Sequence, residues 1–367
     1  MRTRALFWTA ALIVIATVAS VDAQVAARRL TIDDIFHPTR RINFSGTPET
    51  PIAWLDATSY LSRRRVTNGV EWIKVDAVSG RSAPLFDAGA MESALAALPG
   101  VTREEASRSA RSDDLVLNPS RTGALVTIAD DLYFYTFGST KADRLTAQAG
   151  EEEVATFSPD GRTVAFVREN DLFVIDLATQ REQALTTDGD PQILNGKLDW
   201  LYQEEIYGRG QFRGYWWSPD STRIAFLQLD ERPVPEYTVV DHIPYRPALE
   251  VTDYPKAGDP NPLVKLGVAR VAGGDPSWID LSAYSATEFL IVNVAWSPDS
   301  QQVVHQVQDR EQTWLDLNLA EVSSGGTRRV LREVTSAWVN ENGNPVWLKD
   351  GSFLWFSERS GFKHLYR

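Results

Sequence analysis

The chain has 367 residues, of which 43% are hydrophobic and 23% charged, as is usual for a folded globular protein. Its net charge of −12 leaves no basic footprint for nucleic acid, and the absence of cysteine excludes disulfides, thiolate metal sites and a cysteine nucleophile. We expect neither a metal nor a cofactor, because the four histidines are scattered without ligand spacing: His37, His242, His305 and His364.

The first 23 residues have the three-part plan of a secretory signal peptide. Arg2 and Arg4 precede an apolar run over residues 5–18, and Val21 and Ala23 occupy the small-residue positions before a cleavage point. This apolar run is shorter than the roughly 20 residues that a membrane-spanning helix needs. We therefore expect cleavage and export, to the periplasm or the exterior, over the alternative of an N-terminal membrane anchor.

One phrase recurs along the rest of the chain: an aromatic residue or leucine, a turn, and two apolar strands joined by a short polar turn. In the Ser-Pro-Asp-Gly form, proline presets φ, aspartate bonds its own backbone, and glycine or serine closes the turn. The strands alternate apolar and polar residues and are rich in Val, Ile, Phe and Tyr, as half-buried strands are. The copies start at Trp54, Leu117, Phe157, Trp217, Trp296 and Trp347.

Six copies at unequal intervals favour a β-propeller, whose blades are four-stranded sheets of roughly 40 to 50 residues that tolerate insertions. We expect an all-β fold of about six blades, with the aromatic residue before each turn packed between neighbouring sheets. A β-sandwich is the alternative, but its strands would not repeat this turn. The stretch "DAGAMESALAALPG", residues 87–100, predicts a short helix between blades.

A second helix is predicted within "LDWLYQEEIYGRG", residues 198–210, where the repeat is interrupted. Asp199 is its predicted N-cap, the helix runs over residues 200–207, and Gly208 and Gly210 are its stop signals.

Two adjacent carboxylates, Glu204 and Glu205, lie among the aromatic residues of this helix. Like charges repel, and in a desolvated place one of the two would tend to protonate unless a cation joined them. A primary ammonium has three donors that two carboxylates can share. The pair is therefore a candidate substrate-binding site for a free amino terminus; alternatively, both residues only solvate one face of the helix.

Three stretches, "DWLYQEEIY" from 199, "GYWWSPDSTRIAFLQLDE" from 214 and "YPKAGDPNPLVKLGV" from 254, resemble the dipeptidyl peptidase IV family of the prolyl oligopeptidase superfamily. "RLTIDDIF" from 29 and "DGSFLWFSERSGFKHLY" from 350 extend the likeness across residues 24–367. The resemblance implies an eight-bladed N-terminal propeller above a C-terminal α/β-hydrolase domain. It also implies a serine peptidase that releases N-terminal dipeptides ending in Pro or Ala, with Glu204 and Glu205 holding the substrate's free amine. A homodimer is possible for the full-length form.

Two parts of the family pattern are not found in the sequence. No arginine near "DDLYFYTFGS", residues 130–139, matches the one that holds the substrate carbonyl in the better-known branch. The chain also has no Gly-x-Ser-x-Gly nucleophile elbow. We therefore expect a propeller portion truncated at its C-terminus, without catalytic residues or the hydrolase domain, and inactive on its own.

Two functional alternatives remain open. A stand-alone periplasmic propeller that binds other proteins would explain the missing hydrolase domain, although such a scaffold has no use for a paired-glutamate insertion. Release of tripeptides is the other alternative, because the pocket for the residue before the cut lies largely in the hydrolase domain.

Overall fold

The computed structural model describes residues 29–38 and 53–367, so the predicted signal peptide lies outside the described residues. The chain divides into two compact units, Met1–Trp54 and Leu55–Arg367. Within the part that is described, no helix is both long and apolar enough to cross a bilayer.

The first unit contains one short helix, α2 (Ile32–Phe36), and the strand β1 (Ala53–Trp54), among its described residues. A reciprocal capping box starts the helix. The Asp34 amide donates to the Thr31 hydroxyl at 3.3 Å, and the Thr31 amide donates to the Asp34 carboxylate at 2.8 Å.

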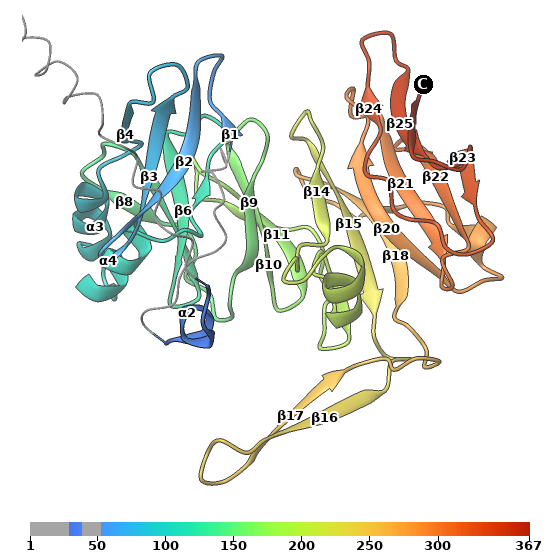
Figure 1. Ribbon diagram of the computed structural model, residues 1–367, viewed down its shortest axis with the longest axis horizontal. Helices are drawn as coiled ribbons and strands as arrows, with labels where there is room; N and C mark the ends of the chain where they lie inside the picture. The colour runs from blue at the N-terminus through green and yellow to red at the C-terminus, as the bar shows by residue number, and fades with distance from the viewer. Residues whose placement is uncertain (1–28, 39–52) are drawn as a thin grey trace, which may run out of the picture. The chain divides into compact units, whose positions relative to one another are not determined.

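The second unit is built from six antiparallel sheets that follow one another along the chain (Figure 1). The first sheet contains β2 (Ser59–Val66), β3 (Gly69–Asp76) and β4 (Ser82–Pro84). The second contains β5 (Val116–Leu117), β6 (Gly123–Ile128), β7 (Asp131–Thr136) and β8 (Ala142–Arg144). The third contains β9 (Glu153–Phe157), β10 (Thr163–Arg168), β11 (Asp171–Asp176) and β12 (Glu182–Ala184). The fourth sheet contains β13 (Ile193–Asn195), β14 (Tyr215–Trp217), β15 (Arg223–Asp230), β18 (Leu263–Arg270) and β19 (Ser277–Trp278). The fifth contains β20 (Phe289–Trp296), β21 (Gln302–Asp309), β22 (Trp314–Glu321) and β23 (Thr327–Val334). The sixth contains β24 (Val346–Trp347), β25 (Phe353–Ser357) and β26 (His364–Tyr366). A 3-10 turn, η2 (Ser282–Tyr284), precedes β20.

These sheets confirm the all-β prediction, because each predicted turn phrase lies at the start of one sheet. Successive small antiparallel sheets of this kind are the blades of a β-propeller. Adjacent blades meet where β5 lies near β9, β11 near β13, and β14 near β20.

The Ser-Pro-Asp turns join consecutive blades as well as closing their own. Within one turn, the Ser218 hydroxyl donates to the Asp220 carboxylate at 2.6 Å. The Asp220 amide then donates to the Ser300 hydroxyl of the following blade's turn at 3.0 Å. One blade earlier, the Asp160 amide donates to the Ser221 hydroxyl at 3.1 Å. The serine that ends each of these turns therefore accepts a hydrogen bond from the turn of the preceding blade.

Two of the tryptophans that precede these turns bridge neighbouring sheets, as predicted. The Trp217 indole donates to the Thr156 hydroxyl of β9 at 3.1 Å. The Trp296 indole donates to the Trp216 carbonyl of β14 at 2.9 Å. A buried indole N–H needs a partner, and here each finds it on the preceding blade.

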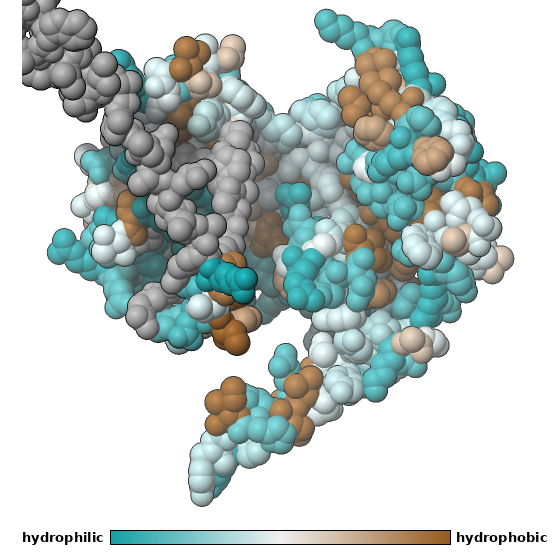
Figure 2. All heavy atoms as spheres, in the orientation of Figure 1, coloured by the Kyte–Doolittle hydropathy of each residue, from teal (hydrophilic) through white to brown (hydrophobic). Residues whose placement is uncertain are grey.

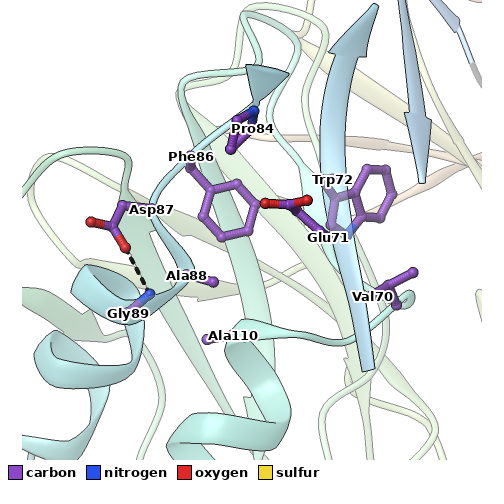
Figure 3. Close-up of a pocket in the computed structure, with 9 residues that line it drawn as sticks. All are labelled: Val70, Glu71, Trp72, Pro84, Phe86, Asp87, Ala88, Gly89 and Ala110. Carbon is purple, nitrogen blue, oxygen red and sulfur yellow. Dashed lines mark hydrogen bonds between the residues drawn. The ribbon is translucent and has the colours of Figure 1, made fainter. Parts of the chain in front are cut away.

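The helix predicted in residues 87–100 is present, but it has a partner that the sequence analysis missed. α3 (Ala88–Ala96) begins at Asp87, whose carboxylate accepts from the Gly89 amide at 2.8 Å (Figure 3). α4 (Arg103–Ala110) follows and packs against α3. Its signal was the capping box Thr102-x-x-Glu105, in which the Thr102 amide donates to the Glu105 carboxylate at 2.8 Å.

A two-stranded ribbon of β16 (Glu236–Asp241) and β17 (Ala248–Asp253), here called the arm, extends away from the fourth sheet (Figure 1). It was not predicted. The register pairs Val240 with Leu249 and Thr238 with Val251, so three apolar side chains share one face. All three are at least 40% exposed, and Figure 2 shows apolar residues gathered on the arm.

Candidate functional site

The predicted amine site lies on a segment, residues 197–213, that interrupts the first strand of the fourth sheet. β13 and β14 pair in line with the same edge of β15, and the segment leaves between them. Its neck is closed by two glycines: the Gly214 amide donates to the Gly196 carbonyl at 2.9 Å, and both are hydrogen-bonded to Leu227. We call residues 197–213 the insertion segment.

Glycine suits both sides of this neck. Gly196 has φ +74°, a conformation that side chains with a Cβ rarely adopt. A Cβ at Gly214 would lie 3.0 Å from a Leu198 methyl group and 3.2 Å from the Gly196 carbonyl carbon. The two chain segments at the neck can therefore approach this closely because neither position carries a side chain.

The helix inside the insertion segment is capped by Asp199, as predicted. The Asp199 carboxylate accepts from the Tyr202 amide at 2.9 Å and from the Leu201 amide at 3.3 Å. Beyond this first turn the helix widens into a π-helix, η1 (Tyr202–Ile206), closed by the Tyr207 amide on the Tyr202 carbonyl at 2.8 Å. The prediction specified a helix but not its type; π-turns are rare and frequent at functional sites.

Two tyrosines fasten this helix to the next blade through a single residue. The Tyr207 hydroxyl donates to the Ile291 carbonyl at 3.1 Å, and the Ile291 amide donates to the Tyr202 hydroxyl at 3.4 Å. Ile291 lies at a register shift of β20, where the strand ladder is interrupted. Burial raises the pKa of both tyrosines, which keeps them protonated. The paired glutamates therefore stand on a helix anchored at both ends.

The two glutamates have different surroundings. Glu204 has a side chain only 16% exposed, and it is ion-paired with Arg209, whose Nε donates to it at 2.7 Å. This hydrogen bond raises the pKa of Arg209. Arg209 itself is 84% exposed, so the counter-ion of Glu204 lies on the solvent side of the pair.

Glu205 is exposed and lines a cavity of about 560 Å³. Glu204 does not line this cavity, so the structure brings the two carboxylates to adjacent positions without turning both into one pocket. The wall beside Glu205 is aromatic and basic, and its residues come from three separate parts of the chain: Trp200, Tyr254 with Lys256, and Arg310.

The aromatic part of the wall joins the insertion segment to the root of the arm. The rings of Trp200 and Tyr254 lie 4.1 Å apart, and the ring of Tyr237 lies 5.7 Å from that of Tyr254. Lys256 stands 4.6 Å from the Tyr237 ring centroid. The cavity therefore presents Glu205 beside rings that can cover an apolar group.

Two further carboxyl groups, Glu231 and Asp253, lie near the Asp199 cap and were not predicted from the sequence. Burial, followed by the charge of Asp253, raises the pKa of Asp199 to about 6. Burial, followed by the charges of Asp199 and Asp253, raises the pKa of Glu231 to about 8. Burial also raises the pKa of Asp253. No local pattern signals this group, because its members come from distant segments.

In the part of the chain that the structure describes, no three His, Asp or Glu side chains converge as a metal site would require. A second cavity, of about 550 Å³, lies between β3 and the α3–α4 pair (Figure 3). It is lined by Glu71, Trp72 and Phe86 among others, and by none of the predicted site residues.

Comparison with known proteins agrees with this architecture. The family model "Dipeptidyl peptidase IV (DPP IV) N-terminal region" matches residues 125–367. A "Probable dipeptidyl peptidase 4" of Neosartorya fischeri is 33% identical over 238 residues, which cover 60% of this chain and 30% of that protein. A "Dipeptidyl peptidase 4" of Trichophyton tonsurans is 30% identical over 234 residues, which cover 60% of this chain and 29% of that protein. The aligned region thus spans less than a third of these curated relatives.

Among solved structures, the crystal structure of Porphyromonas gingivalis dipeptidyl peptidase 4 superposes with a TM-score of 0.74. The superposition covers 93% of this chain and 47% of that one, at 23% sequence identity. At this identity the likeness concerns the fold, and it supports the propeller architecture of the described sheets.

Proposed function

The chain belongs to the family of the dipeptidyl peptidase IV N-terminal region, and on that premise we propose that it is the propeller portion of an exported serine exopeptidase. In the complete enzyme it binds the free amine of a peptide through Glu204 and Glu205. A hydrolase domain then releases the N-terminal dipeptide, with Pro or Ala before the cut.

The observation that carries this proposal is the rigid placement of two adjacent carboxylates on a helix fastened at both ends. Asp199 caps the helix start, and the Tyr207 hydroxyl anchors its end to Ile291. A held pair of carboxylates loses little conformational freedom when it binds an ammonium, so more of the interaction energy remains as affinity. A merely solvated helix face would need no such anchoring.

Arg209 has a defined part in this proposal. Its guanidinium occupies Glu204 while the site is empty, and its high exposure lets it swing into solvent when an ammonium arrives. The ammonium of the substrate then takes the place of the Arg209 guanidinium, so the half-buried Glu204 is never left without a positive partner. This exchange avoids the cost of an unpaired buried charge.

The cavity beside Glu205 supports a short, partly apolar substrate end. Trp200 and Tyr254 offer ring faces to an aliphatic side chain. Arg310, whose Nη1 donates to Glu288 at 2.8 Å, presents a cation on the same wall.

The test combines binding and turnover. The chain is titrated with an Ala-Pro peptide carrying a free N-terminus and with its N-acetylated twin, and heat release is measured. Only the free-amine peptide is expected to bind, and Glu205→Gln is expected to abolish its binding. When the hydrolase domain is supplied on the same chain, Glu204→Gln or Glu205→Gln should lower kcat/KM by roughly ten- to a hundredfold, since a charge-assisted bond contributes about 1.5 to 3 kcal/mol.

Matched variants separate a binding role from a structural one. Asp241→Asn, on the exposed arm, removes a carboxylate of similar charge and should leave binding and turnover unchanged. Equal binding of the free and acetylated peptides would contradict the proposal. So would unchanged kcat/KM in both glutamate variants at normal thermal stability, because the pair would then be only a solvated helix face.

The arm supports a further part of the proposal, a homodimer. A two-stranded ribbon is marginal on its own in water, and this one exposes Val240, Leu249 and Val251 on one face. A second copy of the chain, laying the same face against it, would bury these side chains in an isologous contact.

A further inference from the structure

A basic groove lies in the first blade, apart from the insertion segment. It is a cavity of about 560 Å³ between the β2–β3 hairpin and the end of α4. Among its lining residues, four arginines face a single carboxylate: Arg63, Arg65, Arg108 and Arg111 against Asp113. We call this cavity the arginine groove. Its charge is opposite in sign to that of the chain as a whole, which is −12.

The floor of the arginine groove is held by three hydrogen bonds to successive carbonyls after α4. The Val70 amide donates to the Arg111 carbonyl at 2.9 Å. The Trp72 indole donates to the Ser112 carbonyl at 2.9 Å, and Arg63 Nη1 donates to the Asp113 carbonyl at 3.0 Å. The hairpin and the helix end therefore form one rigid wall, from which the guanidiniums project.

The arginines of β2 divide between the two faces of the strand. Successive residues point to opposite faces, so Arg63 and Arg65 share one face and Arg64 lies on the other. Arg64 is neutralised there by Glu71, directly opposite on β3, which accepts from its Nε at 3.1 Å. In the described chain, by contrast, Arg65 makes no ion pair and no side-chain hydrogen bond.

The protein's own groups do not account for this positive charge. The C-terminus of α4 supplies a partial charge of only about −0.5. Arg111 is satisfied by Glu92, at 2.8 Å. Arg108 meets Glu104 at 3.5 Å, but their side chains are 71% and 88% exposed, so water screens the pair. The positive charges of Arg63, Arg65 and Arg108 thus face one remaining carboxylate of the lining, Asp113, and Arg65 is the arginine whose guanidinium has no partner among the described residues.

We propose that the arginine groove binds a multivalent phosphate group, either of a soluble oligophosphate or of an anionic lipid headgroup. A planar guanidinium matches phosphate oxygens with two parallel hydrogen bonds. A phosphate group presents more charge and more acceptor oxygens in a small volume than a single carboxylate does, which suits several guanidiniums around one cavity.

The test uses the full chain and two probes. Tripolyphosphate is titrated by calorimetry at low and at raised salt, and co-sedimentation is measured with phosphatidylcholine vesicles with and without phosphatidic acid. We expect salt-sensitive binding to at least one probe. Arg65→Gln should weaken it about tenfold, as expected for the loss of one charge-assisted contact. Arg64→Gln, which removes the same charge from the opposite face, should change it less than twofold, a small effect on the scale of one such contact.

The probes also distinguish the sources of phosphate. Binding of tripolyphosphate alone assigns a soluble ligand, and binding of phosphatidic acid vesicles assigns a headgroup. The proposal is overturned if neither probe binds, if citrate binds as tightly as tripolyphosphate, or if Arg64→Gln weakens binding as much as Arg65→Gln. Arg65 is an exposed side chain without partners in the described structure, and thermal unfolding of the variant verifies that the fold is unchanged.

Discussion

The Tyr207 hydroxyl and the Ile291 carbonyl, 3.1 Å apart, join the insertion segment to the neighbouring blade. Tyr207→Phe is expected to destabilise the chain by about 1 to 2 kcal/mol, because the carbonyl at the β20 register shift loses its partner. Urea unfolding measures the change. Tyr237→Phe, which removes a hydroxyl on the exposed arm, is the control and should have no effect. Equal stability of the Tyr207 variant and the parent would contradict the anchoring role.

Ser300 links two blades while adopting a left-handed backbone, with φ 60°. Ser300→Ala should cost about 1 kcal/mol, because the Asp220 amide loses its acceptor and the strained backbone remains. Ser300→Gly loses the same bond but relieves roughly 1 to 2 kcal/mol of strain. We therefore expect the glycine variant to be close to the parent in thermal unfolding. An alanine variant as stable as the glycine variant would argue against this account.

His305 is expected to make the folded chain less stable in acid. It is fully buried in β21, and burial lowers its pKa from 6.5 to about 4. The unfolded chain binds a proton below pH 6.5 that the folded chain refuses until about pH 4, so unfolding becomes easier over this window. The loss reaches about 3 kcal/mol, at about 1.36 kcal/mol for each pKa unit.

His305→Leu is expected to flatten this part of the pH dependence of the unfolding free energy. The substitution also removes two ring nitrogens that have no hydrogen-bond partner among the described residues, so stability at neutral pH should not fall steeply. His364→Gln, in an exposed strand, is the matched control and should leave the profile unchanged. An unaltered acid limb in His305→Leu would show that other groups cause it.

The arm is expected to determine the oligomeric state. Leu249→Glu with Val251→Glu places two like charges on its apolar face, which would shift a dimer to monomer in light scattering coupled to gel filtration. Glu250→Gln lies on the opposite face of the same strand and should leave the mass unchanged. A parent chain that is monomeric at every concentration tested would remove the basis of the dimer proposal.

Local chemistry made much of the propeller predictable. The Ser218-Pro219-Asp220 turn and its copies are specified by residues next to one another, and the Asp199 cap lies three residues from the amide that it accepts. The arm was missed because its strands alternate as blade strands do, and only tertiary contacts distinguish them. α4 was missed although its capping box was legible in the sequence.

The site was predictable only in its first layer. Glu204 and Glu205 stand out as neighbours in sequence, and Arg209 follows close behind. The wall beside Glu205 and the cluster of the carboxylates Asp199, Glu231 and Asp253 are formed by residues that are distant in sequence. The raised pKa values of these carboxylates depend on burial, which the order of charges along the sequence does not reveal.

The neck of the insertion segment has a consequence for engineering. The chain leaves the strand at Gly196 and returns at Gly214, and the two glycines are hydrogen-bonded to each other. The insertion segment therefore starts and ends at one fixed point of the blade. A replacement segment that ends at these two glycines is expected to keep the register of β13 and β14 on β15, provided that it refills the buried core positions of Leu198 and Tyr202. Recognition elements grafted from other chains would therefore replace the exposed part of the segment around Glu205 and keep the glycines and the tyrosine anchors on either side of it.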